Sequence, residues 1–326
     1  MARIKALIDG VWHGDLEETP EVREALKTRA HVFRNWITPD GSPGPSGDGG
    51  FPAEAGRYHI YVSYACPWAH RTILYRRLKG LENVVSISVL HPQMGDARGW
   101  RFGDSDMSTP DRANGRDLLY EVYQLGHPGV TSRVTVPTLW DTKRGIVVNK
   151  ESGDIIRMLN SAFDACGNSE VDFYPADLRE EIDAMNAVLL PKVCAGVYRA
   201  GFARSQAAYD TSVRELFETL DWLEERLAHQ PFLLGERITE SDWHLFCTLA
   251  RFDAAYHSAL KCNLRRLVDY PALSAYTRRI YELPGVSETV KFDHIMRHYH
   301  DYIGDVDPTI VPIGPAVDFR GLPARA

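Results

Sequence analysis

The sequence has little of several features that would point to particular protein classes. Its 326 residues include only five cysteines, which form neither a paired metal-ligand spacing nor a disulfide framework. No apolar run is long enough for a signal peptide or a membrane span. The net charge is −7. The sequence has no basic stripe with interleaved aromatic residues, which is the pattern typical of nucleic-acid binding. We therefore expect a cytoplasmic protein with no membrane segment, no metal site and no nucleic-acid partner.

What is present is the composition of an ordinary globular protein, with 44% apolar and 25% charged residues. Its length allows two domains. We expect an N-terminal extension and loop over residues 1–56, an α/β domain over residues 57–165, and an all-helical domain over residues 174–326 that ends in an extended tail. The extension contains a short predicted helix at 21–30 and a loop at 39–56 that is rich in Gly and Pro.

The α/β domain is predicted from alternating strand and helix patterns. The expected elements are a strand at 58–62, a helix at 67–79, a strand at 84–90, a helix at 116–125, a hairpin of strands at 132–140 and 146–150, and a helix from 151 to 163. This order of elements, a βαβ unit followed by αββα, is the order of the thioredoxin fold. Beyond Pro175 only helices are predicted, at 178–190, 213–230, 238–252, 271–282 and 285–299. The third of these begins with a capping box, Thr239 and Asp242.

Cys66 occupies the junction between the first strand of this domain and its first helix. Pro67 at the first helical position and Gly80 just past the end are the usual punctuation of a helix. The N–H groups and positive dipole end of a helix N-terminus stabilise a thiolate, which predicts a reactive cysteine. The alternative is a buried cysteine that acts as a small apolar side chain. Ala69 stands where a second cysteine would act as a resolving thiol, so a mixed disulfide with an external thiol is favoured.

Two further pairs of residues suit the binding of a peptide. In thioredoxin-like proteins the proline at the position of Pro137 follows a cis peptide bond and faces the active cysteine. The backbone of Val136 could then pair with an extended ligand. Glu151 and Ser152 begin a helix, where N–H groups and a hydroxyl suit a carboxylate and the glutamate suits an ammonium group. The alternatives are an ordinary turn proline and an ordinary helix start.

The chain resembles the Xi-class glutathione transferases, the glutathionyl-hydroquinone reductases, from about residue 31 to residue 315. The segments that carry the resemblance are ACPWAHRT, GWRF, SRVTVPTLWD, NKES, GVYRAGFA, SDWHLF, RFDAAY, KCNLRRLVDYP and DPTIVPIGP. Omega-class transferases and dehydroascorbate reductases share the cysteine and the fold but lack GWRF, GVYRAGFA and the tail. The resemblance implies the glutathione transferase architecture, an α/β thioredoxin-like domain followed by an all-α domain, assembled as a homodimer.

The resemblance also implies an activity, the glutathione-dependent reduction of S-glutathionyl-hydroquinones to hydroquinones. Cys66 would attack the thioether sulfur, and a second glutathione would release glutathione disulfide by a ping-pong mechanism. Tyr198 and Tyr299 match two family tyrosines of the helical domain that serve the aromatic substrate. The residues that match the family's glutathione contacts are Trp100, Arg133, Val136, Glu151 and Ser152.

Each assignment has a plainer alternative. The tyrosines could be core residues with satisfied hydroxyls, Trp100 a core aromatic and Arg133 a surface arginine. His70, one turn after Cys66, is expected to pack rather than act as its base, and the other cysteines are expected to be structural.

The chain departs from the family pattern near its C-terminus. It has Asp307-Pro308-Thr309 where the family often has Asn-Pro-Thr, and residues 300–306 also differ. The lining of the hydroquinone pocket is therefore left open. Two alternative functions also remain: an Omega-like thioltransferase or dehydroascorbate reductase, and a non-catalytic module used in protein assembly, which would not need a thiol at position 66.

Overall fold

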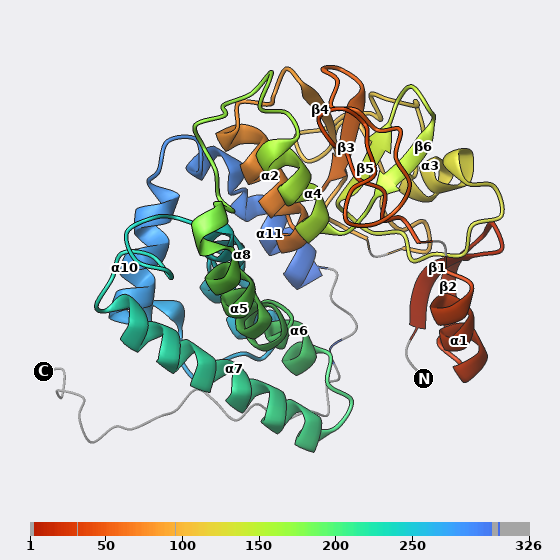
Figure 1. Ribbon diagram of the computed structural model, residues 1–326. Coiled ribbons are helices and arrows are strands. Elements are labelled where there is room, and N and C mark those ends of the chain that lie inside the picture. The colour runs from red at the N-terminus through yellow and green to blue at the C-terminus, as the bar shows by residue number, and fades with distance from the viewer. Residues whose placement is uncertain (1–2, 31, 95, 302–305, 307–326) are drawn as a thin grey trace, which may run out of the picture. The chain divides into compact units, whose positions relative to one another are not determined.

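The computed structural model describes residues 3–30, 32–94, 96–301 and 306 (Figure 1). The chain forms two compact units. The first contains the described part of Met1–Pro175 together with that of Leu283–Tyr302, and the second contains the described part of Ala176–Glu282 together with that of Ile303–Ala326. The strands and helices of the first unit are β1 Arg3–Ile8, β2 Val11–Glu17, α1 Pro20–Thr28, β3 Tyr58–Val62, α2 Pro67–Leu78, β4 Val85–Val89, α3 Leu119–Gly126, β5 Thr138–Asp141, β6 Ile146–Asn149, α4 Ser152–Ser161 and α11 Phe292–Asp301.

A four-stranded mixed sheet with the order β4-β3-β5-β6 forms the centre of the first unit. β3 and β4 are parallel, as the predicted βαβ unit requires, while β5 is antiparallel to both β3 and β6. Helices α2 and α4 pack against each other, and α3 packs on β6. All five residues of β3 are buried, as expected for a central strand covered on both faces. The predicted thioredoxin-like topology is confirmed.

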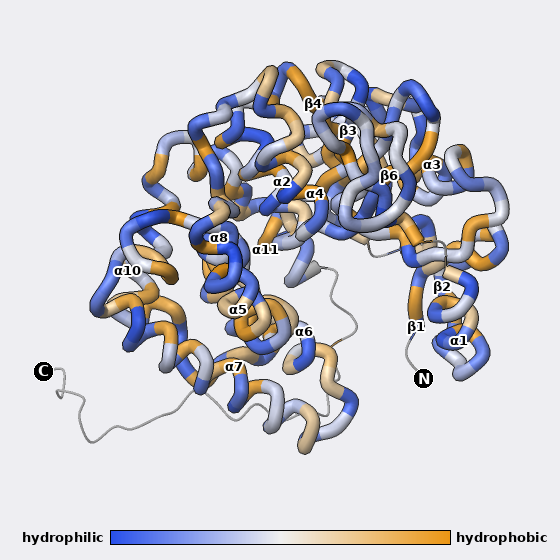
Figure 2. The backbone as a smooth tube through the Cα atoms, in the orientation of Figure 1, coloured by the Kyte–Doolittle hydropathy of each residue, from blue (hydrophilic) through white to orange (hydrophobic). Residues whose placement is uncertain are grey.

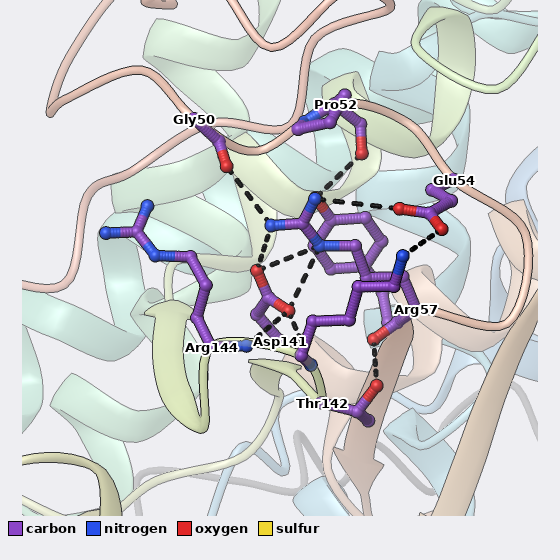
Figure 3. Close-up of polar contacts among 9 residues, drawn as sticks. Gly50, Pro52, Glu54, Arg57, Asp141, Thr142 and Arg144 are labelled. Atoms are coloured by element: carbon purple, nitrogen blue, oxygen red, sulfur yellow. Dashed lines mark hydrogen bonds and ion pairs between the residues drawn. The ribbon is translucent and has the colours of Figure 1, made fainter.

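A buried ion pair joins the start of β3 to the end of β5 (Figure 3). The guanidinium of Arg57 donates to both carboxylate oxygens of Asp141 at 2.5 to 3.1 Å, and the two side chains are only 8% and 0% exposed. The same guanidinium donates to the carbonyl oxygen of Gly50 at 3.1 Å, which ties down the Gly/Pro-rich loop. Asp141 also accepts the backbone N–H groups of Lys143 and Arg144 in the hairpin turn. Each oxygen of this buried carboxylate therefore has a partner.

The N-terminal extension contains a hairpin that was not predicted from the sequence. β1 and β2 pair antiparallel, and Ile8 faces Val11 across a two-residue turn. The turn residues Asp9 and Gly10 both have positive φ, 49° and 80°, as a type I′ hairpin turn requires. An Asp-Gly pair between apolar residues is the sequence signal for this turn, and it could have been recognised. The predicted helix at 21–30 is confirmed as α1.

The second unit is helical in its described residues. Its helices are α5 Arg179–Leu189, α6 Gly196–Gly201, α7 Gln206–Leu227, α8 Glu240–Leu249, α9 His257–Ala259 and α10 Pro271–Tyr281. Short 3-10 or π turns of the chain lie at Ala176–Leu178, Leu190–Cys194, Phe252–Tyr256, Leu267–Asp269 and Ser287–Thr289. Figure 2 shows apolar and polar residues alternating along α7, whose buried face carries the predicted leucines and Phe217.

The predicted capping box at the start of α8 is confirmed. The backbone N–H and the hydroxyl of Thr239 donate to Oδ2 of Asp242 at 2.8 and 2.9 Å. The other oxygen of Asp242 accepts from the hydroxyl of Tyr276 at 3.0 Å and from the N–H of Leu233 at 2.9 Å. Burial raises the pKa of the Asp242 carboxyl, and these donors act in the opposite direction.

The compact units and the predicted domains group one segment differently. The sequence pattern placed everything from residue 174 onward in the helical domain, whereas α11 belongs with the α/β unit. The physical reason is a set of specific contacts. The ring of His294 meets that of Tyr64, and Thr289, just before α11, meets the imidazole of His70. The predicted extended tail, with Asp307-Pro308-Thr309, lies outside the described residues.

Candidate active site

Cys66 is the N-cap residue of α2, as predicted. Its φ and ψ are −79° and 122°, Pro67 follows at the first helical position, and its carbonyl accepts the first helical bond from His70 N–H at 2.9 Å. The first turn of the helix carries no acidic residue. The partly exposed thiol therefore lies at the positive end of a twelve-residue helix with no carboxylate in that turn to oppose a negative charge.

The Val136–Pro137 peptide bond is cis, as predicted, and it lies directly before β5. Sγ of Cys66 lies 3.6 Å from the carbonyl oxygen of Val136, so the thiol can donate to it. The structure thus brings together two segments that are 70 residues apart in the sequence. This contact places the cysteine beside the backbone that is predicted to pair with a peptide ligand.

Glu151 and Ser152 begin α4, as predicted. The first helical bond runs from Ile155 N–H to the carbonyl of Glu151 at 3.0 Å, so the earlier N–H groups have no partner within the helix. The backbone N–H of Glu151 donates to Oδ1 of the fully buried Asn149 at 2.7 Å, which fixes the direction of the N-cap. The exposed Glu151 carboxylate and the helix N-terminus together provide both signs of charge for a zwitterionic ligand.

Trp100 and Arg133 are also in the first unit, but in different environments. The Trp100 side chain is 7% exposed, and its carbonyl accepts from the N–H of Leu119 at 3.0 Å. Arg133 is about half exposed, and its Nη2 lies 2.6 Å from a carboxylate oxygen of Glu18 in the N-terminal extension. The arginine that was predicted to bind a ligand carboxylate therefore already binds a carboxylate of the protein.

Tyr299 lies on α11 and is 2% exposed, with its ring edge-on to that of His298 at 4.9 Å. The prediction assigned it to the helical domain, but it shares a compact unit with Cys66 and Trp100. Tyr198 lies on α6 in the other unit and is half-buried. Of the predicted site residues, Tyr198 is thus the one in the second unit.

Tyr256 was not predicted as a site residue. Its hydroxyl lies 3.3 Å from that of Tyr198, the two rings are edge-on at 5.8 Å, and Tyr256 is fully buried. The segment RFDAAY contributed only to the resemblance, and a tyrosine on a helical face gives no further sequence signal. The structure makes Tyr256 a candidate for setting the position of the Tyr198 hydroxyl.

The structure also shows the surroundings of His70 and of the four other cysteines. His70 is fully buried and its Nε2 lies 2.8 Å from the hydroxyl of Thr289, in keeping with a packing role. None of the five cysteines forms a disulfide. Cys194, Cys247 and Cys262 are buried, and burial raises the pKa of the Cys262 thiol far above its usual range. Cys166 is exposed in the loop after α4.

The described part of the chain has neither of two features that would change the functional class. No helix there is both long enough and apolar enough to cross a bilayer. Nor do three or more His, Cys, Asp or Glu side chains within it come together in a way that could hold a metal ion.

Residues 65–162 match the family described as "Glutathione S-transferase, N-terminal domain", and residues 206–279 match "Glutathione S-transferase, C-terminal domain". The chain is 48% identical over 314 residues to glutathionyl-hydroquinone reductase YqjG of Escherichia coli, covering 96% of this chain and 95% of that protein. It is 45% identical over 317 residues to glutathionyl-hydroquinone reductase PcpF of Sphingobium chlorophenolicum, covering 97% and 98%.

Solved structures give the same result. The glutathione-bound structure of YqjG, a glutathione transferase homologue from Escherichia coli K-12, matches with a TM-score of 0.85, 46% identity and 96% coverage of both chains. The Xi-class transferase of Natrialba magadii matches with a TM-score of 0.85 and 41% identity, covering 98% of this chain and 96% of that one. The chain therefore belongs to the glutathione transferase superfamily and, within it, to the Xi class, the family of the glutathionyl-hydroquinone reductases.

Proposed function

We propose that this protein reduces S-glutathionyl-hydroquinones to hydroquinones, with glutathione as the reductant and Cys66 as the nucleophile. The observation that carries the proposal is the position of the Cys66 thiol, at a helix N-terminus and 3.6 Å from the Val136 carbonyl. The names of YqjG and PcpF, both glutathionyl-hydroquinone reductases, support the substrate class. The solved structure of YqjG with bound glutathione supports the co-substrate.

The reaction has two steps. In the first, the Cys66 thiolate attacks the sulfur of the thioether, a Cys66–glutathione disulfide forms, and the bond between sulfur and the ring carbon breaks. The electron pair of that bond stays on the carbon, which takes up a proton, so the ring is reduced while the sulfur is oxidised. In the second step, glutathione attacks the mixed disulfide, which releases glutathione disulfide and restores the Cys66 thiol.

The predicted residues have distinct tasks in this proposal. Val136 would pair with the peptide backbone of glutathione, and Glu151 and Ser152 would bind its γ-glutamyl end. Trp100 would pack on the peptide, and Arg133 would bind a carboxylate.

Two tyrosines would act on the aromatic part of the substrate. Tyr299 and Tyr198 would orient the ring, and a tyrosine hydroxyl would supply the proton that the ring carbon takes up. The contact between Tyr198 and the buried Tyr256 hydroxyl supports a fixed orientation for the Tyr198 hydroxyl.

The test measures the rate at which glutathionyl-menadione is reduced, with substrate and product separated by chromatography. We expect Cys66→Ala to abolish the reaction, and Tyr198→Phe and Tyr299→Phe to slow it by about 100- to 10,000-fold, the range typical of general acid catalysis. Exchange with a simple glutathione disulfide should depend on Cys66 but much less on the tyrosines. If both tyrosine variants reduce glutathionyl-menadione at the wild-type rate, the hydroquinone assignment fails and an Omega-like thioltransferase is the better description.

We also propose that the protein is a cytoplasmic homodimer. The five cysteine side chains that remain thiols suit a reducing compartment. Light scattering coupled to size-exclusion chromatography would measure a mass near twice 36.8 kDa for a dimer. A mass equal to that of one chain at micromolar concentration would contradict the dimer.

A further inference from the structure

The N-terminal segment, defined here as the described residues between 3 and 38, has no assigned task in the proposed reaction. It nevertheless contacts each of three separate stretches that carry the proposed glutathione contacts, namely those around Arg133, Trp100 and Glu151. All of these residues belong to the first compact unit.

The first contact holds the stretch that leads to Val136. Glu18 binds Arg133 with 2.6 Å between Oε1 and Nη2, and the Glu18 side chain is only 18% exposed. One residue earlier, Ser132 and Leu7 of β1 exchange two backbone hydrogen bonds of 2.9 Å each. The backbone and the side chain of this stretch are therefore both fixed by the N-terminal segment.

The second contact holds the loop that precedes Trp100. Nε1 of Trp12 on β2 donates to the carbonyl oxygen of Ala97 at 2.8 Å, and Lys5 on β1 donates to the carbonyl oxygen of Met94. Gly99 has a φ of +73°, and a Cβ there would lie 3.0 Å from the Trp12 ring. A side chain at position 99 would therefore be strained by the positive φ and would force the Trp12 ring to shift.

The third contact holds the N-terminus of α4. The Arg34 guanidinium binds both oxygens of Asp154, in the first turn of the helix, at 2.5 and 3.0 Å. The Asn149 amide donates to the carbonyl oxygen of Asn35 at 3.0 Å and, with its own oxygen, accepts the Glu151 N–H at 2.7 Å. Asn149 therefore links the N-terminal segment directly to the N-cap of the helix.

We propose that the N-terminal segment is a functional part of the glutathione site, with Glu18 and Arg34 as positioning residues. Glu18 engages Nη2 of the Arg133 guanidinium, and the N–H groups of Nε and Nη1 point in different directions, so each can donate a single hydrogen bond to a ligand carboxylate. A half-exposed arginine that is already ordered loses less rotamer freedom when the ligand binds. Arg34, through its ion pair with Asp154, orders the N-terminus of α4 before the ligand binds. This inference rests on the proposed function.

The test uses S-methylglutathione, which cannot form a disulfide, and measures its Kd by calorimetry. We expect Glu18→Gln and Arg34→Gln each to raise the Kd by about two- to fivefold, the effect of one partly exposed ion pair. Glu24→Gln, an exposed change on α1 outside these contacts, should leave it unchanged. The rate at which Cys66 reacts with bis(2-hydroxyethyl) disulfide, which has no carboxylate, should stay at the wild-type value in every variant. A rate that falls in parallel with the affinity would mean general loosening of the fold and would overturn the inference.

Arg133→Gln separates the proposed contact from its positioning. If Arg133→Gln leaves the Kd unchanged, the proposed glutathione contact itself is wrong. If Arg133→Gln weakens binding while Glu18→Gln and Arg34→Gln do not, only the positioning inference fails.

Hydrogen exchange of the wild-type chain provides a test that needs no variant. Because coupling between binding and local stability is reciprocal, S-methylglutathione should slow exchange of the Leu7 and Ser132 amides. Unchanged exchange at both amides under saturating ligand would count against the inference.

Discussion

The indole ring of Trp100 and the imidazole ring of His298 lie parallel, with 6° between their planes and 5.8 Å between their centroids. His298 is itself held by a 2.6 Å contact between its Nδ1 and the carbonyl oxygen of Pro92. A carbonyl oxygen only accepts, so Nδ1 carries the proton. Helix α11 thus supports the tryptophan that is proposed to pack on glutathione.

His298→Ala should therefore weaken glutathione binding. Stacked aromatic pairs contribute about 0.5–1.5 kcal/mol beyond their buried area, which predicts a KM for glutathione about two- to tenfold higher. His298→Phe keeps a ring but loses the bond to Pro92, and it should lie between wild type and His298→Ala. Arg297→Ala, an exposed change on the same helix, is the control. An unchanged KM in His298→Ala would show that Trp100 needs no support from α11.

Ala69→Cys should convert the active site toward dithiol chemistry. Position 69 is fully buried and lies three residues after Cys66 on α2, the spacing of a Cys-x-x-Cys pair. The new thiol should attack the Cys66–glutathione disulfide and form an internal disulfide, so that the adduct no longer accumulates. Mass spectrometry after incubation with glutathione disulfide should show a mass increase for wild type and a two-proton loss for Ala69→Cys. A persistent glutathione adduct in the variant would contradict this.

Arg57→Met should destabilise the fold strongly, because it leaves the fully buried Asp141 carboxylate without its cation (Figure 3). Removing one partner of such a pair costs about 3–5 kcal/mol. Urea unfolding followed by circular dichroism measures the loss. Arg237→Met, which breaks the exposed pair with Asp177, should have a much smaller effect. Equal losses in the two variants would refute the distinction between buried and exposed pairs.

Acid should destabilise the protein in part through His59. This residue is 1% exposed between the hydroxyls of Ser86 and Ser88, and burial lowers its pKa to about 4 from an ordinary value of 6.5. Between these two values the unfolded chain binds a proton that the folded chain does not. The unfolding free energy should therefore fall as the pH is lowered from about 7 to about 4, by up to about 3 kcal/mol from this group.

The control for this prediction compares slopes rather than absolute stabilities. His59→Asn should flatten the pH dependence of the unfolding free energy over that window, whatever its effect on stability at pH 7. The same change at the exposed His229 should leave the slope as it is in wild type. A His59→Asn slope equal to that of wild type would rule out His59 as the source.

Local patterns predicted most of the α/β unit and the start of one helix in the second unit. The buried strand at 58–62, the Pro67 and Gly80 boundaries and the Thr239 capping box are each specified by residues close in sequence, and each was confirmed. The cis bond before Pro137 was expected from the thioredoxin-like order of the elements rather than from the residues themselves.

Long-range contacts could not be predicted in the same way. Nothing in the sequence near Arg133 indicates Glu18, which lies 115 residues earlier. The assignment of α11 to the α/β unit likewise depends on the contacts of His294 and His298, which no local pattern encodes. The partnership of Tyr198 and Tyr256, 58 residues apart, is of the same kind.

Segments outside the four-stranded sheet form hydrogen bonds with its two edge strands, and this has a consequence for aggregation. β6 is an edge strand, yet Asn35 donates its N–H to the carbonyl of Val148 at 3.1 Å, so the N-terminal segment covers part of that edge. At the opposite edge, Thr109 exchanges hydrogen bonds with Val89 of β4 at 2.9 Å. Uncovered edge strands act as templates for pairing with other chains. A chain shortened to begin at Arg57 would keep every strand of the sheet and still expose β6 to pairing with other molecules.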